Sequence, residues 1–142
     1  MAGDVEAVEY LTVEYLTVED LVGLARLLLG DPPPMRDMGL LGSAAARPQT
    51  TVFGTDAYQD PWTKAAALLQ SVVKNHALVD GNKRLGWLAT AVFLEVNGMP
   101  VVHTSNDSVY EFVWGVAAGS DTVDDIAAAL QRLAAEGTTE AG

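Results

Sequence analysis

The chain has 142 residues, of which 49% are hydrophobic, so it is long and apolar enough to form one domain that buries roughly 70% of its unfolded surface. Its formal net charge of −11 argues against nucleic acid or an anionic membrane surface as a direct partner. The sequence contains no cysteine, which excludes disulfides, thiol catalysis and Cys-ligated zinc, and no apolar run reaches the ~18 residues that span a bilayer.

The N-terminal region contains a direct repeat, "VEYLTVEYLTVED", with a unit of five residues. We expect residues 1–16 to form an extension in which the first copy is irregular. The second copy ends in Thr17 to Asp20, which has the pattern of a capping box and predicts a helix through "LVGLARLLL", ended by Gly30. The acidic start, "MAGDVEAVEY", has neither the basic nor the apolar region of a signal peptide, so we expect a cytoplasmic protein.

The next region alternates helical and extended patterns. "MGLLGSAAAR" predicts a short helix that closes before Pro48. In "PQTTVFGTDAYQD", residues that favour β-structure lie on both sides of Gly54, which predicts an extended loop or a small hairpin. Asp60 and Pro61 then provide an N-cap and a first-turn proline for a long helix, "WTKAAALLQSVVKNH".

A Gly-Asn pair ends that helical pattern, and a second strong helix is predicted from about Lys83 to Val96. Its spacing places Leu85, Leu88, Val92 and Val96 on one face. "SNDSVYEFVWGVAAG" and "DTVDDIAAALQRLAA" predict two further helices. The predicted fold is therefore an all-α, compact bundle of five to six helices with a short extended flap, built from residues 17–135 and followed by a flexible tail at 136–142.

The stretch "KNHALVDGNKRLGW" differs from the apolar helices around it. Three of the eight Lys and Arg residues, Lys74, Lys83 and Arg84, fall within eleven positions of an acidic chain. The Gly81-Asn82 turn would leave free backbone N–H groups at the start of the following helix, which is a favourable place for an anion. Cations in a first helical turn oppose the helix dipole unless an anion lies in front of them, so this arrangement predicts a phosphate site.

Two further side chains add chemistry to this predicted phosphate site. Asp80 is a hard oxygen ligand, and one carboxylate together with substrate phosphates is the usual way to hold Mg²⁺. His76, four residues earlier, has the pKa range of a general base for a hydroxyl group. Taken singly, each residue has an ordinary structural explanation, such as a helix end, a turn or an exposed charged pair. Their joint spacing favours phosphoryl-type transfer.

The same stretch resembles the Fic motif, His-Pro-Phe-x-x-Gly-Asn-Gly-Arg-x-x-Arg, and specifically its Doc variant, His-x-Phe-x-Asp-x-Asn-Lys-Arg. Identity and spacing match at six positions: His76, Asp80, Gly81, Asn82, Lys83 and Arg84. The resemblance extends through "YLTVEDL", "RDMGLLGSAAARP", "KAAALLQSVVKNH" and "AVFLEVNG". It therefore covers roughly residues 15 to 135 and implies the helical fold of the Fic/Doc family.

The resemblance implies roles for the matching residues. His76 would deprotonate a hydroxyl group of a target protein, and Asp80 would hold Mg²⁺. Asn82, Lys83 and Arg84, with the Gly81 turn, would bind the phosphates of ATP. The segment around Thr51, Val52, Phe53 and Gly54 is similar to the Fic flap, which pairs with the backbone of the target as an added strand.

Three positions depart from the general Fic pattern. Leu78 replaces the motif Phe, which anchors the loop in the core, and we expect Leu to be a smaller anchor. Trp87 replaces the second Arg of nucleotidyl-transferring Fic proteins, and Lys83 replaces the small residue of their anion site. These changes match the Doc branch, whose members act as kinases that transfer the γ-phosphate of ATP. The family target is a threonine of elongation factor Tu, and its phosphorylation blocks translation.

Many Fic proteins carry a self-inhibitory Ser/Thr-x-x-x-Glu-Gly/Asn motif. The only Glu followed by Gly or Asn in this chain is Glu136, and Arg132 stands four residues before it, so the motif is absent. The resemblance thus implies a cognate small antitoxin as the restraining partner. Two alternatives remain open: an AMP or other nucleotidyl transferase, and a catalytically silent module that binds an antitoxin or a nucleotide.

Overall fold

The computed structural model describes residues 12–101 and 104–141. Within these residues the chain forms six α-helices, one 3₁₀ helix and one two-stranded hairpin, which confirms the predicted all-α bundle with a short flap. The elements are α2 (Val18–Leu29), α3 (Met38–Ala46), the 3₁₀ helix η1 (Arg47–Gln49), β1 (Thr51–Val52), β2 (Thr55–Asp56), α4 (Pro61–Asn75), α5 (Asn82–Val96), α6 (Asn106–Ala118) and α7 (Val123–Ala141).

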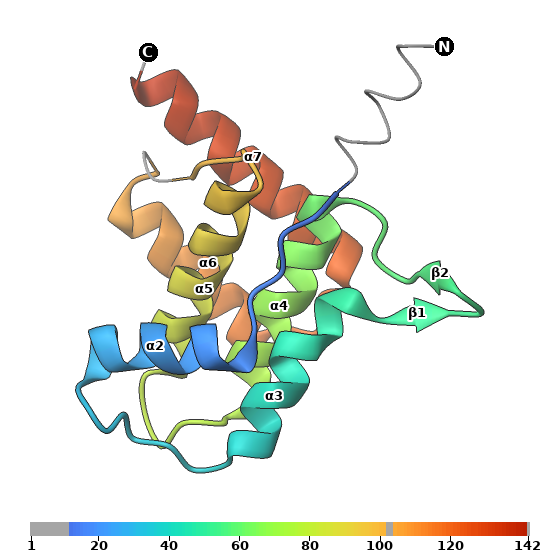
Figure 1. Cartoon of the computed structure of the whole chain (residues 1–142). Helices are drawn as coiled ribbons and strands as arrows, with labels where there is room; N and C mark the ends of the chain where they lie inside the picture. The colour runs from blue at the N-terminus through green and yellow to red at the C-terminus, as the bar shows by residue number, and fades with distance from the viewer. Residues whose placement is uncertain (1–11, 102–103, 142) are drawn as a thin grey trace.

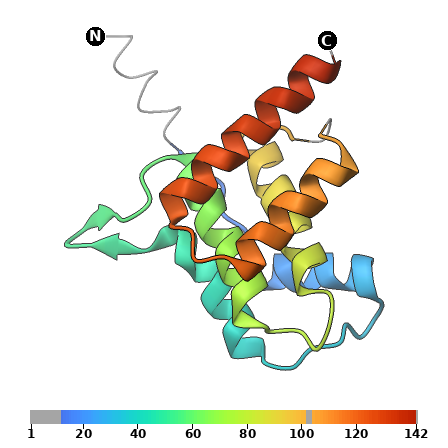
Figure 2. The same ribbon diagram turned by 180° about the vertical axis from the view of Figure 1, so that it is seen from behind.

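Helix α4 forms the centre of the bundle. Nine of its fifteen residues are buried, and it packs against α3, α5, α6 and α7. Figures 1 and 2 show α7 crossing one face of α4, whereas the hairpin projects from the bundle on the side opposite α5 and α6. A helix that is apolar on most of its circumference is stable only when it is surrounded in this way.

The sequence signals for two helix starts are confirmed. The Thr17 hydroxyl accepts a hydrogen bond from Asp20 N, and the Asp20 carboxylate accepts one from Thr17 N, which completes the capping box of α2. At α4, Asp60 Oδ1 accepts from Thr63 N at 3.0 Å, and Pro61 occupies the first turn. Each such cap contributes about 1 kcal/mol, because it satisfies a backbone donor that the helix itself cannot.

The buried face of α5 differs from its predicted face. Leu85 is buried as predicted, but Val96 is 51% exposed, and Phe93 and Leu94 lie in the core instead. A stripe of Leu and Val residues marks the right helix, but the neighbouring helices decide which of its faces is covered. Here α2, α4 and α6 surround α5 over more than one face, so Ala89 and Phe93 become core residues.

Structure is present on both sides of the predicted domain, residues 17–135. Helix α7 continues to Ala141, so the tail predicted at 136–142 is helical as far as this residue. Gly137 does not stop the helix, because one interior glycine costs only about 1 kcal/mol. At the other end, Tyr15 and Leu16 of the second repeat copy pack against the core, and Glu14 N donates to Asn97 Oδ1 at 2.9 Å. The first copy lies outside the described residues, apart from its last residue.

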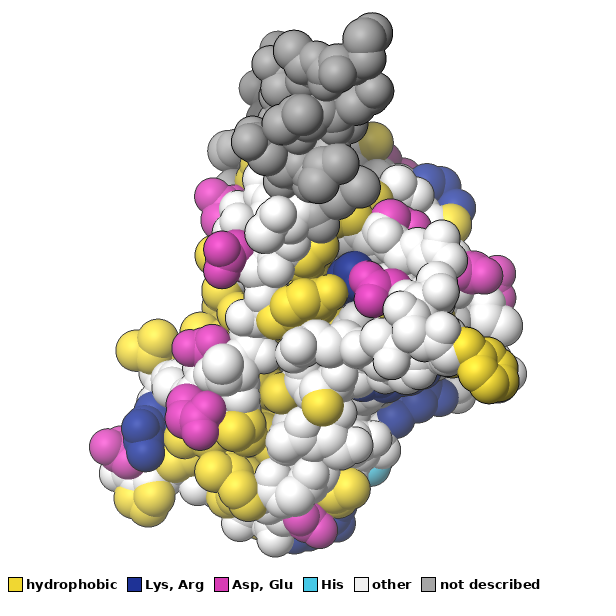
Figure 3. Space-filling model, turned by 45° about the vertical axis from the view of Figure 1, so that its right-hand side comes forward, with side chains coloured by type: hydrophobic (Ala, Val, Ile, Leu, Met, Phe, Trp, Pro, Cys, Tyr) yellow, Lys and Arg dark blue, Asp and Glu magenta, His cyan; other side chains and the backbone are white. Residues whose placement is uncertain are grey.

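None of the helices in the described part of the chain is both long and apolar enough to cross a membrane. Figure 3 shows the face from which the hairpin projects. On that face acidic side chains are scattered, and the described Lys and Arg side chains form no continuous basic area. This distribution agrees with the acidic net charge.

A buried lysine fixes the base of the hairpin. Lys64 of α4 is only 1% exposed, and its ammonium donates to Asp56 Oδ2 at 3.0 Å and to the Tyr58 carbonyl oxygen. It also lies 5.6 Å from the centroid of the Tyr15 ring. Burial lowers the pKa of Lys64, but the hydrogen bonds and charges of Asp56 and Tyr15 outweigh it and hold this pKa above the ordinary value of 10.5.

The raised pKa makes a prediction for alkaline stability. A lysine whose pKa is higher in the folded than in the unfolded protein contributes its full stabilisation at pH values below its pKa in the unfolded protein. This contribution is lost as the pH rises through its pKa in the folded protein. The free energy of unfolding should therefore fall at pH values above about 10.5. Urea titrations at pH 9 and pH 11 measure this fall. The Lys64→Met variant should be less stable than the parent protein at pH 9, and its free energy of unfolding should fall less between pH 9 and pH 11. An equal fall in the two proteins would show that Lys64 does not cause the loss of stability.

Candidate active site

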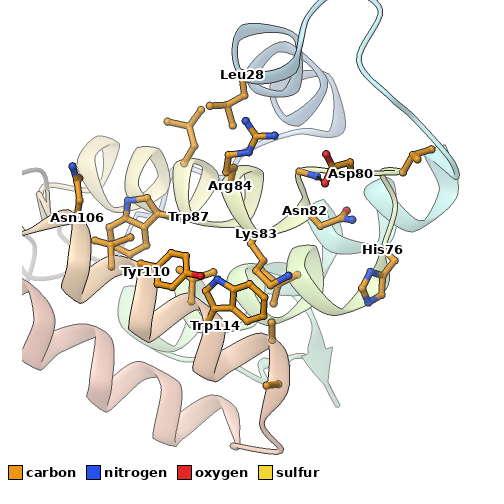
Figure 4. Close-up of a pocket in the computed structure, with 18 residues that line it drawn as sticks. Leu28, His76, Asp80, Asn82, Lys83, Arg84, Trp87, Asn106, Tyr110 and Trp114 are labelled. Atoms are coloured by element: carbon orange, nitrogen blue, oxygen red, sulfur yellow. Dashed lines mark hydrogen bonds between the residues drawn. The ribbon is translucent and has the colours of Figure 1, made fainter.

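The six predicted residues of the motif line one cavity. Its volume is about 810 Å³, and it lies between the α4–α5 loop, the first turns of α5 and one face of α6 (Figure 4). The motif residues that line it are His76, Asp80, Gly81, Asn82, Lys83 and Arg84. The four predicted flap residues do not line the cavity, because the hairpin projects away from the bundle.

The α4–α5 loop is held by a short ladder of backbone hydrogen bonds to the segment before α3. The Ala77 carbonyl oxygen accepts from Arg36 N at 2.8 Å and from Asp37 N at 2.9 Å, and Val79 N donates to the Pro34 carbonyl oxygen at 2.8 Å. The Arg36 guanidinium also donates to the carbonyl oxygen of His76. The loop is therefore fixed before any ligand binds, which a phosphate or metal site requires.

Leu78 is the apolar anchor of this loop. Its side chain is 1% exposed and belongs to the main core, so leucine fills the place of the motif Phe as expected. Asn82 closes the loop around it: Asn82 Oδ1 accepts from Leu78 N, and Asn82 Nδ2 donates to the Leu78 carbonyl oxygen, both at 3.0 Å. Because Asn82 Oδ1 and one of the two Nδ2 hydrogens are used in this way, the backbone N–H and the second Nδ2 hydrogen remain for the phosphate role that was predicted for this residue.

His76 terminates α4 in the left-handed conformation, with φ of +54° and ψ of +46°. Its side chain is exposed, and within the described residues no hydrogen bond or ion pair involves the imidazole. Figure 4 shows His76 at one end of the cavity, with Asp80 and Asn82 between it and Arg84. Both imidazole nitrogens are thus available to a ligand or a substrate hydroxyl.

The start of α5 has the geometry of an anion site. Gly81 has φ of +88° and lacks a side chain that could cap the helix, so the backbone donors of the first turn face the cavity without a side-chain partner in the described chain. Gly81 N donates to Asp80 Oδ1 at 2.9 Å, which leaves Asp80 Oδ2 free. A glycine-permitted turn followed by a helix N-terminus is the usual backbone arrangement for binding phosphate.

A divalent metal at this site would rest on Asp80. The described residues contain no group of three or more His, Cys, Asp or Glu side chains that could hold a metal alone. One exposed carboxylate next to an anion site fits Mg²⁺, which commonly binds through one or two carboxylates, substrate phosphates and water. The residues present therefore suit a metal that arrives with a phosphorylated ligand.

The three cations of the sequence cluster have different positions. Lys83 Nζ lies 4.2 Å from the centroid of the Trp114 ring, at the wall of the cavity. The Arg84 side chain is exposed, and its guanidinium has no hydrogen bond or ion pair to another described residue. Lys74 instead donates to the carbonyl oxygen of Gly119 at the end of α6, and it does not line the cavity. Two of the three cations therefore line the cavity, at the start of α5.

The aromatic wall of the cavity was not predicted from the sequence. Tyr110 and Trp114 of α6 line it and contact each other, with ring centroids 5.8 Å apart. Trp87 packs edge-on against Phe112 at 6.3 Å. The available signal was the spacing of four between Tyr110 and Trp114, which places both rings on one helix face. Nothing in the sequence showed that this face would lie opposite the motif.

Comparison with known proteins agrees with this geometry. Residues 15–94 match the Fic/DOC family. The chain belongs to this family. Over 122 residues it is also 46% identical to a protein named Toxin Doc from Mycolicibacterium smegmatis, and this match covers 85% of the chain and 94% of that protein. The Fic/DOC assignment and its Doc branch, which the motif predicted, are thereby confirmed.

Proposed function

We propose that this protein is a Doc-type toxin that transfers the γ-phosphate of Mg-ATP to a serine or threonine hydroxyl of a target protein. One observation carries the proposal, which is that a single cavity is lined by four kinds of group. Within the described residues these are an imidazole without a hydrogen-bond partner, a carboxylate with one free oxygen, an uncapped helix N-terminus and two cations. Phosphoryl transfer needs little more than positioned phosphates, compensating charge and a group that accepts the hydroxyl proton.

Each residue has a role in this transfer. The backbone N–H groups at the start of α5, with Lys83 and Arg84, would bind the phosphates, and Asp80 would hold the Mg²⁺ that offsets their charge. The oxygen of the target hydroxyl would form a bond to the γ-phosphorus, and His76 would accept the proton of that hydroxyl. The bond between this phosphorus and the β,γ-bridging oxygen would break, and ADP would leave with the electron pair.

Two side chains favour γ-phosphate transfer over AMP transfer. Trp87 occupies the position of the second Fic arginine, so this position supplies no guanidinium. Its side chain is half-buried and packs against Phe112. Lys83 places a long cationic side chain where nucleotidyl transferases have a small residue. The nucleotidyl transferase remains the second candidate, because Gly81 retains part of the general Fic pattern. A silent binding module is less supported, since it needs neither the free imidazole nor the free carboxylate.

The proposal includes two protein partners. The relative's name, Toxin Doc, supports an antitoxin as the restraining partner. Elongation factor Tu is the proposed target, by resemblance to the Doc branch. The target would dock on the hairpin at Thr51, Val52, Phe53 and Gly54. Phe53 supports this role, because it is fully exposed although its φ of +52° is unfavourable for a bulky residue.

ATP labelled separately at the α- and γ-phosphate tests the function. The purified protein and its His76→Ala variant are each incubated with Mg²⁺ and a bacterial extract that contains elongation factor Tu. We expect a protein band labelled only from γ-labelled ATP, and only with the parent protein. A band labelled from α-labelled ATP would instead establish nucleotidyl transfer. Binding of ATP without any labelled band would favour the silent module.

Replacing Arg84 by alanine should weaken ATP binding and label transfer together. A charge-assisted hydrogen bond to phosphate contributes about 1.5–3 kcal/mol, which corresponds to a loss of affinity of roughly 10- to 150-fold. Isothermal titration calorimetry with ATP measures this loss. Lys74→Ala is the matched control, because Lys74 belongs to the same sequence cluster but points towards Gly119. Equal affinities of the two variants would contradict a phosphate role for Arg84.

A further inference from the structure

The side chain of Lys83 is held by an aromatic ring. Its Nζ lies 4.2 Å from the centroid of the Trp114 ring, and it forms no hydrogen bond or ion pair with another described residue. Figure 4 shows this side chain extending from the start of α5 toward Trp114 on α6. The face of an indole ring carries negative electrostatic potential and attracts an ammonium group within about 6 Å of its centroid. The ring therefore stabilises a cation that the dipole of α5 disfavours.

The contact restricts where the Lys83 ammonium can lie. Both side chains line the cavity, and Lys83 is half-buried there. Trp114 is oriented in turn by Tyr110, one helical turn earlier, with ring centroids 5.8 Å apart and an angle of 46° between the ring planes. A lysine side chain that moves freely in water loses rotamer freedom when it binds a ligand, and this loss lowers the affinity. Because the ring already restricts Lys83, less freedom is left to lose.

An aromatic partner leaves the charge of Lys83 available to a phosphate. A carboxylate in the place of the ring would neutralise the ammonium and repel an incoming phosphate. The ring carries no net charge, and none of the three N–H donors of the ammonium is bound to an acceptor in the described part of the chain. Charge-assisted hydrogen bonds to phosphate are stronger than the attraction of an exposed ring face. Trp114 therefore fixes the position of the ammonium without competing with the phosphate for its charge.

The ring acts on one of the two cations at the start of α5. Arg84 is the next residue along the chain, but in Figure 4 its guanidinium lies on the side of Leu28, away from Trp114. Among the described residues no aromatic ring lies over this guanidinium. An effect of Trp114 on phosphate binding should therefore depend on Lys83 and not on Arg84. The two cations of one helical turn thus provide a test and its control.

We propose that Trp114 is a positioning residue for phosphate binding, because it holds the Lys83 ammonium at the wall of the cavity where the phosphates of a nucleotide would bind. This inference rests on the proposed function, which places those phosphates at the start of α5. It assigns a role to a residue of α6 that lies outside the motif. It also states what the ring recognises, which is a cation of the protein and not the base of the nucleotide.

Inorganic tripolyphosphate separates these two roles of the ring, because it carries the three phosphates of ATP without a base. Isothermal titration calorimetry with Mg²⁺ compares the parent with Trp114→Leu and Trp114→Phe. We expect Trp114→Leu to bind tripolyphosphate about fivefold more weakly, and Trp114→Phe to lie between the two, because phenylalanine keeps an aromatic face. Trp114 is 46% exposed, so the melting temperatures should stay close to that of the parent. Unchanged affinity for tripolyphosphate would overturn the inference, and weaker ATP binding alone would show that the ring contacts the base.

A double-mutant cycle assigns the effect to Lys83. In the Lys83→Met background, Trp114→Leu should cause no further loss of tripolyphosphate affinity. In the Arg84→Ala background, it should weaken binding by the same factor as in the parent. A merely structural role of Trp114 would weaken binding equally in both backgrounds, and this result would also overturn the inference. If Trp114→Leu did not fold, Trp114→Phe would provide the same comparison with a smaller effect.

These results are distinguishable from a failure of the proposed function. Coupling between Trp114 and Lys83 without label transfer from ATP to any protein would contradict the proposed kinase activity alone. Label transfer without this coupling would contradict the inference alone. A parent protein that did not bind tripolyphosphate would have no phosphate site at the start of α5, which would overturn the inference and remove the basis of the proposed function.

Discussion

Replacing His76 by asparagine should reduce label transfer by about 10²- to 10⁴-fold, the usual contribution of a positioned general base. Among the side chains of the α4–α5 loop, the imidazole is the proton acceptor that would remain when Asp80 holds Mg²⁺. Since no described residue forms a hydrogen bond or an ion pair with it, its loss should remove this chemistry and little else. Single-turnover transfer from γ-labelled ATP, at saturating ATP, measures the effect.

Asparagine is the preferred replacement because of the backbone. His76 has φ of +54°, and asparagine tolerates this left-handed conformation better than most residues, whereas alanine adds a strain of about 1 kcal/mol. The melting temperature and the ATP affinity of His76→Asn should therefore equal those of the parent. Transfer at the parent rate would exclude His76 as the base. A matching fall in ATP affinity would show that the loop had moved.

The same substitution should abolish growth arrest when the protein is expressed in bacteria without an antitoxin. Arg84→Ala should reduce the arrest through weaker ATP binding. If arrest persists in the His76→Asn protein at equal expression, toxicity arises from a part of the molecule other than this cavity. The comparison thus separates the proposed biological role from the proposed chemistry.

The features that the sequence predicts well are those fixed by neighbouring residues along the chain. The capping box at Thr17 and the Asp60-Pro61 start of α4 depend on three or four consecutive positions, and both form as predicted. The motif is also local: His76 and Arg84 enclose a turn whose geometry follows from Gly81. The hairpin was predicted only as an extended loop or a small hairpin, because its turn residues, Phe53 and Gly54, are not a common hairpin pair.

The features that the sequence did not predict depend on contacts between distant segments. The contact of Lys83 with Trp114 joins residues thirty-one positions apart along the chain, and no local pattern encodes it. The hydrogen bonds between the Asn82 side chain and the backbone of Leu78 are local. The sequence did not predict them, because asparagine suits both a phosphate-binding role and a loop-closing role. The covered face of α5 was missed because α2, α4 and α6 together determine it.

Replacing Gly81 by alanine should damage both stability and the site. A Cβ at this position would lie 2.7 Å from Leu29 Cδ1 and Cδ2, and φ is +88°, so the substitution adds strain and crowding together. We expect a loss of about 1–3 kcal/mol in the free energy of unfolding. We also expect weaker ATP binding, because the Gly81 turn sets the position of both Asp80 and the first donors of α5. Urea unfolding and calorimetry measure the two effects.

Gly98→Ala is the matched control for Gly81→Ala. Gly98 has nearly the same φ, +83°, but nothing lies within 4 Å of a Cβ built there, and it does not line the cavity. Its substitution should show the backbone strain alone, about 1 kcal/mol, with ATP affinity unchanged. The excess effect of Gly81→Ala then measures the contact with Leu29, and combining Gly81→Ala with Leu29→Ala should recover part of it. Equal losses of stability and unchanged ATP affinity in both glycine variants would mean that the anion site does not depend on the close packing of Gly81 against α2.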